Sequence, residues 1–531
     1  MNEEILKLIK QKGVLLEKEV FDVFNEINDV ESARHLLETL ERFSGQKMIT
    51  KSAINKNFSL VRNLGSALQG EEKILVEKTF IKLGLSLEIT KETSIVSNPS
   101  INVIIEKPKV ETRKEESYKI FYSTTRNDKK LEVADFVGSF RSRYQQLQRI
   151  LMNRPDMQNL VSINKLGSER KNHVIIGIVS EKRITKNKNL IIKVEDLTGE
   201  ISVLVKADRP EIYMKGEELL LDDVVAIKAS GSREMLFVQD IYFPDAFLSE
   251  RTRFDEDVCI AFLSDIHAGG AKHLQKSFEN FLNWINTEDE MAKKIKYIFI
   301  SGDNVDGVGI FPGQEALLKL KSMKEQYSLL ASYLAKIPKR ITMFMCPGQH
   351  DAVRVAEPQP IIGRKYAEPL YSIENLILVS NPALVKLSEK EKEFKVMMYH
   401  GDSIHTFIHE IPELRSMKMH PAKAVRHMLK RRHLFPIHSE AIYIPDAEKD
   451  NLVISEVPDV LCTGEVHRLD IENYNGVLII TGSCWQGQTS FEEKVGNVPD
   501  PCKVPILNLK TRELKVLDFG NEDELKELHV K

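Results

Sequence analysis

The sequence predicts a multidomain α+β protein, with a helical module, a small β-barrel and a larger sheet-based domain in that order. Three observations support this prediction. Apolar residues recur at helical spacing near the N-terminus, short strand-like segments occupy the middle of the chain, and apolar runs in the second half each lead into residues that bind divalent metals. At 531 residues the chain is too long for one compact core, which agrees with several domains.

Composition and charge limit the classes of protein to which the chain can belong. The formal net charge is −3, so any basic surface that binds nucleic acid must be local. No apolar stretch is long enough to span a bilayer, and the N-terminus lacks the apolar core of a signal peptide. The five cysteines show no CxxC spacing, which favours reduced thiols over a structural zinc site. We therefore expect a cytoplasmic protein without a membrane partner.

The N-terminal third is expected to hold a docking module, a linker and a connector. Residues 1–86 show apolar stripes at the 3.6-residue spacing of helices but no recognisable chemistry, so we interpret them as a helical docking module. Residues 87–117 are rich in Thr, Ser, Lys and Glu, which is typical of a flexible linker. Residues 118–169 are interpreted as a helical connector. One face of its helix carries Phe140, Tyr144, Leu147 and Leu151.

Residues 170–248 are predicted to form a small barrel. They contain five strand-like segments separated by turn residues, at 173–179, 190–194, 201–205, 224–229 and 235–241. Together with an Asp-x-Thr-Gly turn at Asp196, this order resembles the oligonucleotide-binding (OB) fold. Such barrels bind single strands through aromatic residues on one face, and this segment has few near that face. A scaffold role is therefore at least as reasonable an interpretation as DNA binding.

The most informative pattern lies in residues 249–520. Apolar runs of this kind are typical of buried strands, and side chains just past the carboxyl ends of several strands meet in one crevice. Turn formation alone would explain one such run but not five in series. The five motifs, in chain order, are D-x-H (Asp265, His267), G-D-x-x-D (302–306), G-Q-H-D (348–351), H-G-D (400–402) and G-E-V-H (464–467). Residues 521–531 are interpreted as a tail.

The order and spacing of these motifs resemble the calcineurin-like metallophosphoesterase superfamily, whose domain has an α/β/β/α architecture. Two close divalent ions need a bridging carboxylate, and Asp303 is the candidate. The resemblance assigns the remaining ligands to two sites, one made of Asp265, His267 and His467 and the other of Gln349, His400 and Glu465. Mixed oxygen and imidazole ligands favour two Mn²⁺ ions, with Fe²⁺ or Mg²⁺ as alternatives.

The third motif also supplies the candidate catalytic residue. By resemblance, His350 assists the leaving oxygen as a general acid, a role that suits an imidazole near neutral pH. Two positions depart from the superfamily pattern: Gln349 replaces the usual Asn, and Glu465 replaces the first His of G-H-x-H. Both side chains offer oxygen to a hard cation, so we expect an altered site that favours Mn²⁺ or Mg²⁺ over softer ions.

A basic cluster follows the fourth motif. Lys423, Arg426, Lys430 and Arg431 are the candidates for contact with the phosphate backbone of a nucleic acid. A solvated helix face is the alternative interpretation, with about equal support.

The segments around the motifs resemble the small subunit of archaeal family D DNA polymerase over most of residues 118–520. They are the barrel before the phosphoesterase motifs, the preceding Asp135-Phe-Val helix, Asp351-Ala-Val-Arg, Met419-His-Pro-Ala-Lys and Pro501-Cys-Lys-Val-Pro-Ile. The resemblance implies a 3′–5′ exonuclease that proofreads for a separate large catalytic subunit. Its DNA substrates would be single strands and primer–template 3′ ends.

Other interpretations stay open from the sequence. No motif resembles a polymerase active site, so DNA synthesis is expected to need the large subunit. The chain could instead be a catalytically silent assembly subunit, since scaffolding members of this superfamily exist, or a stand-alone metallophosphatase. Whether a sliding clamp is a further partner is left open.

Overall fold

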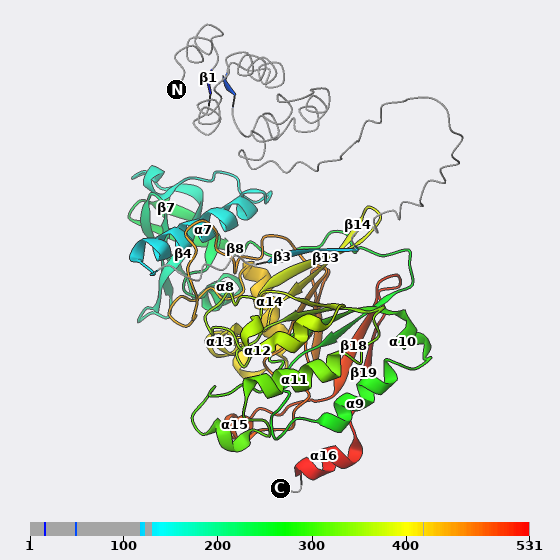
Figure 1. Cartoon of the computed structure of the whole chain (residues 1–531). Helices are drawn as coiled ribbons and strands as arrows, with labels where there is room; N and C mark the ends of the chain where they lie inside the picture. Colours follow the sequence, from blue (N-terminus) through cyan, green and yellow to red (C-terminus); the bar gives the residue numbers. More distant parts are fainter. Residues whose placement is uncertain (1–14, 17–47, 50–116, 123–129, 418, 530–531) are drawn as a thin grey trace, which may run out of the picture. The chain divides into compact units, whose positions relative to one another are not determined.

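The computed structural model describes residues 15–16, 48–49, 117–122, 130–417 and 419–529 (Figure 1). The chain divides into two compact units, residues 1–110 and 111–531. In the first unit the described residues form two short parallel strands, β1 (Leu15–Leu16) and β2 (Met48–Ile49). The rest of the predicted helical module, and the predicted linker up to residue 116, lie outside the described residues.

The segment predicted as a helical connector contains both a strand and a helix. Strand β3 (Tyr118–Tyr122) pairs with β13 of the C-terminal domain, where the sequence pattern indicated a helix. Helix α7 (Val133–Met152) follows, and its apolar face packs on the barrel strands through Tyr144, Leu147 and Leu151. The strand differs from the prediction because its partner lies more than two hundred residues later in the chain, beyond the reach of a local pattern.

A closed five-stranded barrel follows α7. Its strands are β4 (Lys171–Ile184), β5 (Leu190–Asp196), β6 (Gly199–Val205), β7 (Val224–Ser232) and β8 (Met235–Tyr242), with helix α8 (Pro210–Glu218) between β6 and β7. The order around the barrel is β4-β5-β6-β8-β7. Alternate residues of β5 point inward, because a strand has a two-residue period. The assignment of this barrel to the OB fold stays a prediction.

The carboxylate of Asp196 closes the turn between β5 and β6. Its Oδ1 accepts hydrogen bonds from the backbone N–H of Thr198, at 2.7 Å, and of Gly199, at 3.0 Å. This is the usual local role of Asp in a tight turn.

The C-terminal domain contains two six-stranded sheets. The first has the order β12-β11-β10-β9-β18-β19, and the second has the order β16-β17-β15-β14-β13-β3. The strands of the first sheet are β9 (Cys259–Leu263), β10 (Ile295–Ser301), β11 (Thr342–Cys346), β12 (Leu376–Leu378), β18 (Lys503–Asn508) and β19 (Leu514–Asp518). Those of the second are β13 (Ala383–Glu389), β14 (Lys392–Met398), β15 (Val460–Thr463), β16 (Asp470–Tyr474) and β17 (Val477–Thr481), together with β3.

The two sheets pack face to face between layers of helices (Figure 1). In β9, Ile260 and Phe262 join the core between the sheets, whereas Ala261 and Leu263 face the outer helices. Strands buried on both faces have continuous apolar sequences, which explains the runs seen in β9 to β11. Helices α9 (Gln275–Trp284) and α11 (Met323–Leu334) cover the first sheet, and α13 (Ser403–Glu410) and α14 (Pro421–Arg431) cover the second.

The domain also contains the helices α10 (Glu290–Lys294), α12 (Arg364–Ala367), α15 (Ser490–Val495) and α16 (Glu522–His529). The segment interpreted as a tail thus forms α16, which is tied to α9 because Glu524 accepts a hydrogen bond from the backbone N–H of Ser277, at 2.9 Å. All five cysteines are buried free thiols. Within the described residues, no helix has the length and hydropathy needed to cross a membrane.

Candidate metal centre

The five sequence motifs meet at one end of the two sheets. Strands β9, β10 and β11 run parallel in the first sheet, and β14 and β15 run parallel in the second, so their carboxyl ends lie together. Their side chains form three groups whose potential metal-binding atoms lie within 4.8 Å of one another. The groups are Asp265–His267–His467, Asp265–Asp303–His400 and His267–Asp306–His350.

Asp303 lies at the centre of this cluster. Its Oδ2 is 3.3 Å from Nε2 of His400, in one predicted site, and 4.0 Å from Nε2 of His267, in the other. Its Oδ1 accepts a hydrogen bond from the backbone N–H of His350, at 2.9 Å. Asp303 is thus the carboxylate that contacts both sides of the cluster, which is the position a bridging ligand requires.

Three of the four imidazoles in the cluster are oriented through Nδ1. His400 donates from Nδ1 to the carbonyl of Ser301 at 2.9 Å, and His350 donates to the carbonyl of Asp306 at 2.6 Å. His467 Nδ1 lies 2.9 Å from the carboxylate of Glu492. An imidazole held in this way presents Nε2 to the crevice, the usual arrangement for a metal-ligating histidine.

The donors present fit divalent cations. Asp265 Oδ2, His267 Nδ1 and His400 Nε2 are buried and make no well-aligned hydrogen bond, although carboxylate oxygens lie 3.1 Å to 3.3 Å from the two nitrogens. The Nε2 atoms of His267 and His467 lie only 3.0 Å apart. Buried carboxylates and unpaired imidazole nitrogens are costly without compensation, and a cation would satisfy them together. Their mixture of oxygen and nitrogen suits first-row divalent ions such as Mn²⁺.

The protonation of the cluster depends on its own acidic residues. Burial lowers the pKa of His467, but Glu492 and Asp265 outweigh burial and raise that pKa to about 9. Burial raises the pKa of the Asp303 carboxyl. The imidazoles of His400 and His350 outweigh burial and hold that pKa well below its usual range. The raised pKa means that the His467 imidazole keeps its proton to a higher pH than a free imidazole does. Metal binding should therefore release protons and weaken at low pH.

The backbone of the cluster is strained. Five candidate ligands adopt positive φ angles: Asp265 (50°), His267 (49°), Asp303 (46°), Glu465 (73°) and His467 (56°). Residues other than glycine rarely adopt positive φ angles, and each such residue costs of order 1–3 kcal/mol of conformational energy. Strain concentrated in this way is typical of functional sites, because packing elsewhere must hold it in place.

Comparison with known proteins places these residues in a family. Residues 260–469 match the family model for the B-subunit of DNA polymerases alpha and epsilon. The DNA polymerase II small subunit of Methanothermobacter thermautotrophicus is 36% identical over 395 residues, covering 73% of this chain and 80% of that protein. The chain belongs to the family of archaeal DNA polymerase II small subunits. This confirms the resemblance to the small subunit of family D polymerases.

Two further relatives agree with this assignment. The DNA polymerase II small subunit of Thermoplasma acidophilum is 34% identical, covering 78% of this chain and 83% of that protein. The corresponding protein of Pyrococcus furiosus is 39% identical over 400 residues, covering 73% of this chain and 64% of the relative. The match thus spans slightly less than two thirds of the Pyrococcus protein.

Two acidic residues of this small subunit join the cluster without having been assigned from the sequence. Asp306 Oδ1 lies 3.2 Å from His267 Nδ1, and Asp306 shares a potential metal site with His267 and His350. The second Asp of G-D-x-x-D was the signal for it. Glu492 on α15 orients His467. Its only local signal is the capping box Thr489–Glu492, which does not reveal contact with a residue in another motif.

The two residues that depart from the superfamily pattern differ in placement. Glu465 points into the cluster, where its Oε2 lies 3.1 Å from His400 Nε2. Its Oε1 lies 3.6 Å from Nε2 of His405. The side-chain amide of Gln349 instead donates a hydrogen bond to Asp402. The role of Gln349 as a metal ligand stays a prediction.

The four residues of the basic cluster of the small subunit lie on α14, and most of them are paired with acidic residues. Arg431 is only 2% exposed, and its Nε lies 3.0 Å from Asp223 Oδ1 in the barrel. Lys430 Nζ lies 2.7 Å from Glu218 Oε2. These two residues therefore join α14 to the barrel. The burial of Arg431 does not agree with its expected contact with phosphate, whereas contact of Lys430 with phosphate stays a prediction.

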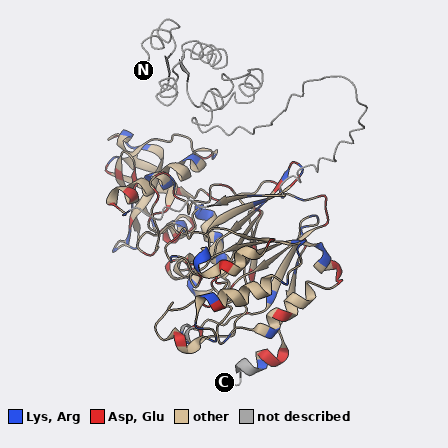
Figure 2. Cartoon of the chain, viewed as in Figure 1, with Lys and Arg blue, Asp and Glu red and all other residues tan. Residues whose placement is uncertain are grey.

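The remaining two basic candidates also have contacts within the protein. Arg426 pairs with Glu472 at 3.3 Å, and Lys423 Nζ lies 3.2 Å from the sulfur of Met417. Figure 2 shows Lys and Arg positions interspersed with Asp and Glu positions along the described chain. Contact of Lys423 or Arg426 with DNA stays a prediction.

Proposed function

We propose that this chain is the small subunit of a two-subunit DNA polymerase and carries a divalent-metal-dependent 3′–5′ exonuclease. It would hydrolyse single-stranded or mismatched DNA 3′ ends, while DNA synthesis would depend on a large catalytic subunit. The observation that carries this proposal is the convergence of carboxylates and imidazoles from separate strand ends around Asp303. Family membership supports the setting in DNA replication.

The chemistry would combine a cation-binding pocket with a proton donor. When bound, two divalent cations would supply Lewis-acid polarisation of the phosphodiester. Water would attack the terminal phosphodiester at phosphorus, breaking its bond to the O3′ of the shortened strand, and that oxygen would take a proton. The products would be a 5′-mononucleotide and a new 3′-hydroxyl end.

We propose that His350 donates that proton. Its side chain is 21% exposed, whereas those of His267 and His400 are 1% exposed, so substrate can reach it. The bond from Nδ1 to the carbonyl of Asp306 leaves Nε2 directed at the crevice. General acid catalysis by a positioned imidazole contributes about 10²–10⁴-fold to rate.

The test is cleavage of a 5′-labelled single strand by the purified full chain with Mn²⁺. Shortening should proceed from the 3′ end, and His350→Ala should slow it by about 100-fold or more. Asp303→Asn should abolish both cleavage and the rise in Tm that Mn²⁺ causes, whereas His350→Ala should keep that rise. His409→Ala is the control, because the His409 side chain is 82% exposed and pairs with Glu410.

A catalytically silent assembly subunit is the second candidate, favoured by the engagement of Gln349 with Asp402. It predicts no cleavage with Mn²⁺, Mg²⁺ or Fe²⁺, with or without the large subunit. Turnover of a small phosphomonoester without DNA cleavage would instead indicate a stand-alone phosphatase. Primer extension by this chain alone would contradict the division of labour between two subunits.

A further inference from the structure

The loop that leaves Asp306 exposes apolar side chains beside the candidate metal centre. Val308, Ile310, Phe311 and Leu317 are 37%, 39%, 41% and 40% exposed. Exposed apolar side chains are normal when they are scattered, but a cluster beside an active site is typical of a ligand-binding surface. None of these four side chains is a candidate ligand of the metal centre.

Two buried glutamines hold the base of this loop. Gln326 Oε1 accepts a hydrogen bond from the N–H of Gly307 at 2.9 Å, and its Nε2 donates to the carbonyl of the same residue at 3.0 Å. Gln314 Nε2 donates to the carbonyl of Asp306 at 2.8 Å, and its Oε1 accepts from the N–H of Ile310 at 3.0 Å. The apolar side chains are therefore presented from a braced backbone.

The loop is coupled directly to His350. The carbonyl of Asp306 accepts hydrogen bonds from both Gln314 Nε2 and His350 Nδ1. A Cβ atom added to Gly307, whose φ is +79°, would lie 2.6 Å from the carbonyl oxygen of His350, so the two backbones are in close approach. The start of this loop therefore lies next to the proposed proton donor.

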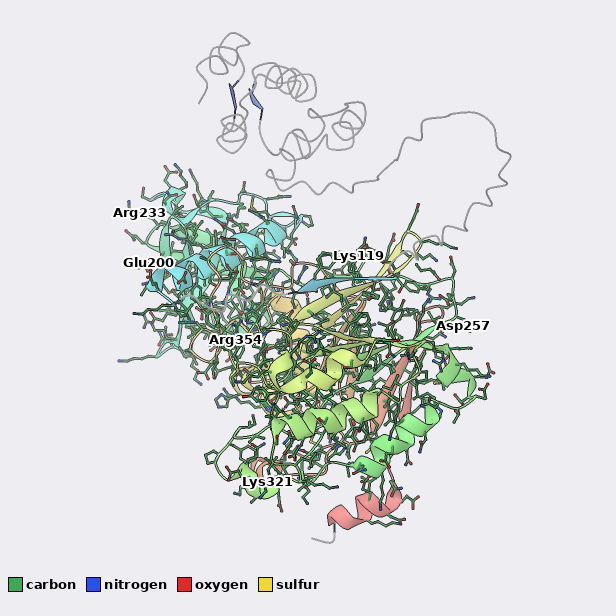
Figure 3. The ribbon with its side chains drawn as sticks, viewed as in Figure 1. Lys119, Glu200, Arg233, Asp257, Lys321 and Arg354 are labelled. Carbon is green, nitrogen blue, oxygen red and sulfur yellow. The ribbon has the colours of Figure 1, made fainter. Side chains whose placement is uncertain are left out.

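Lysines follow the apolar side chains. The backbone N–H of Lys319 donates to the carbonyl of Gly269 at 2.9 Å, which ties this part of the chain to the loop of the first motif. The side chains of Lys319 and Lys321 are exposed, and Figure 3 shows Lys321 near the periphery of the domain. Apolar side chains next to exposed lysines match a single strand, which offers unpaired bases and phosphates together.

We infer that residues 307–317 form the subsite for the unpaired bases at a DNA 3′ end, with Phe311 stacking on one base and Lys319 and Lys321 near the phosphates. This inference rests on the proposed exonuclease function and names the feature of the substrate that the site recognises. Bases in a duplex are paired and stacked, so they cannot reach these side chains. The loop would therefore select frayed or mismatched ends over paired ones.

The first test measures binding without cleavage. The full chain is titrated into a fluorescent oligothymidylate in Ca²⁺ buffer, and anisotropy gives Kd. Phe311→Ala should raise Kd by about tenfold, because stacking on an aromatic side chain contributes about 1–3 kcal/mol per base. Phe311→Trp should bind as tightly as wild type. Phe247→Ala is the matched control, because Phe247 is 69% exposed and belongs to the chain segment that connects β8 to β9.

A second test uses substrates with and without bases. With Mn²⁺, Phe311→Ala should raise KM for the single strand far more than it lowers kcat, because stacking on an aromatic side chain acts in substrate binding. An oligonucleotide with abasic 3′-terminal positions should remove the difference between wild type and Phe311→Ala. If Phe311→Ala leaves both Kd and KM for the single strand unchanged, the subsite is wrong.

The two proposals fail in distinguishable ways. Cleavage by wild type with no effect of Phe311→Ala would overturn the subsite and leave the exonuclease standing. Binding that depends on Phe311, in a chain that cleaves no DNA with any metal, would support the subsite and overturn the exonuclease.

Discussion

In the metal centre, three of the four imidazoles are held in position by a carboxylate or carbonyl oxygen that contacts Nδ1. Glu492 is the clearest case, since it accepts from His467 and is itself only 6% exposed. Such a carboxylate fixes the ring and increases its basicity as a ligand, and its loss typically costs about 10–100-fold in metal affinity or activity.

Replacing Glu492 by Gln should therefore weaken Mn²⁺ binding by about 10–100-fold, measured by isothermal titration calorimetry. Gln still serves in a capping box, so helix α15 should be retained and circular dichroism should not change. Glu493→Gln is the control because that neighbouring side chain is exposed. Equal Mn²⁺ affinity in both variants would show that Glu492 only caps the helix.

Helix α7 contacts both the barrel and the C-terminal domain. Its apolar face packs on the barrel, and Arg143 reaches the other way. Arg143 Nε lies 2.7 Å from Asp450 Oδ2, and His433 Nε2 lies 3.0 Å from the same oxygen. All three side chains are buried, so neither charge of the pair can be relieved by water.

Arg143→Met should destabilise the chain by about 3–5 kcal/mol, because it leaves the carboxylate of Asp450 buried without its cation. Urea unfolding monitored by fluorescence measures this loss. Arg141→Met, on the exposed side of the same helix, should have little effect. The double variant Arg143→Met/Asp450→Asn should recover part of the stability. A single variant as stable as wild type would mean that the ion pair contributes nothing net.

Across the described part of the molecule, the barrel and the C-terminal domain are joined at a second place by charge. Glu218 of the barrel pairs with Lys430 at 2.7 Å and lies 2.9 Å from His427 Nδ1. Burial alone would raise the pKa of Glu218, but His427, Arg431 and Lys430 lower it from 4.5 to about 2. The ionised carboxylate is therefore stabilised by folding.

This interface should be sensitive to acid. Because the folded pKa of Glu218 lies below the unfolded value of 4.5, its contribution is complete above that value and is lost as the pH falls towards 2. Glu218→Gln should cost about 3 kcal/mol at pH 6 and about 1 kcal/mol at pH 3, from urea unfolding at each pH. Glu211→Gln, at an exposed position of α8, is the control. A cost that does not change with pH would contradict this account.

Much of the C-terminal domain and its site could be predicted from local patterns. The runs at β9 to β11 are apolar because both faces of these strands are buried, and motif residues such as Asp265 and His400 directly follow strands. Parallel strands end at one edge of a sheet, so ligands at their ends meet there. The apolar runs thus predict the strands, and the motifs at the strand ends predict the shared crevice, without knowledge of distant contacts.

Long-range pairing could not be predicted in this way. Strand β3 finds its partner in β13, Glu492 reaches His467 from a different segment, and Arg431 turns from a predicted DNA contact into a buried partner of Asp223. A charged residue has the same local sequence whether it faces solvent or a carboxylate from another domain. Its role is set by which surfaces pack together, because burial removes water as the competing partner and makes one ion pair decisive.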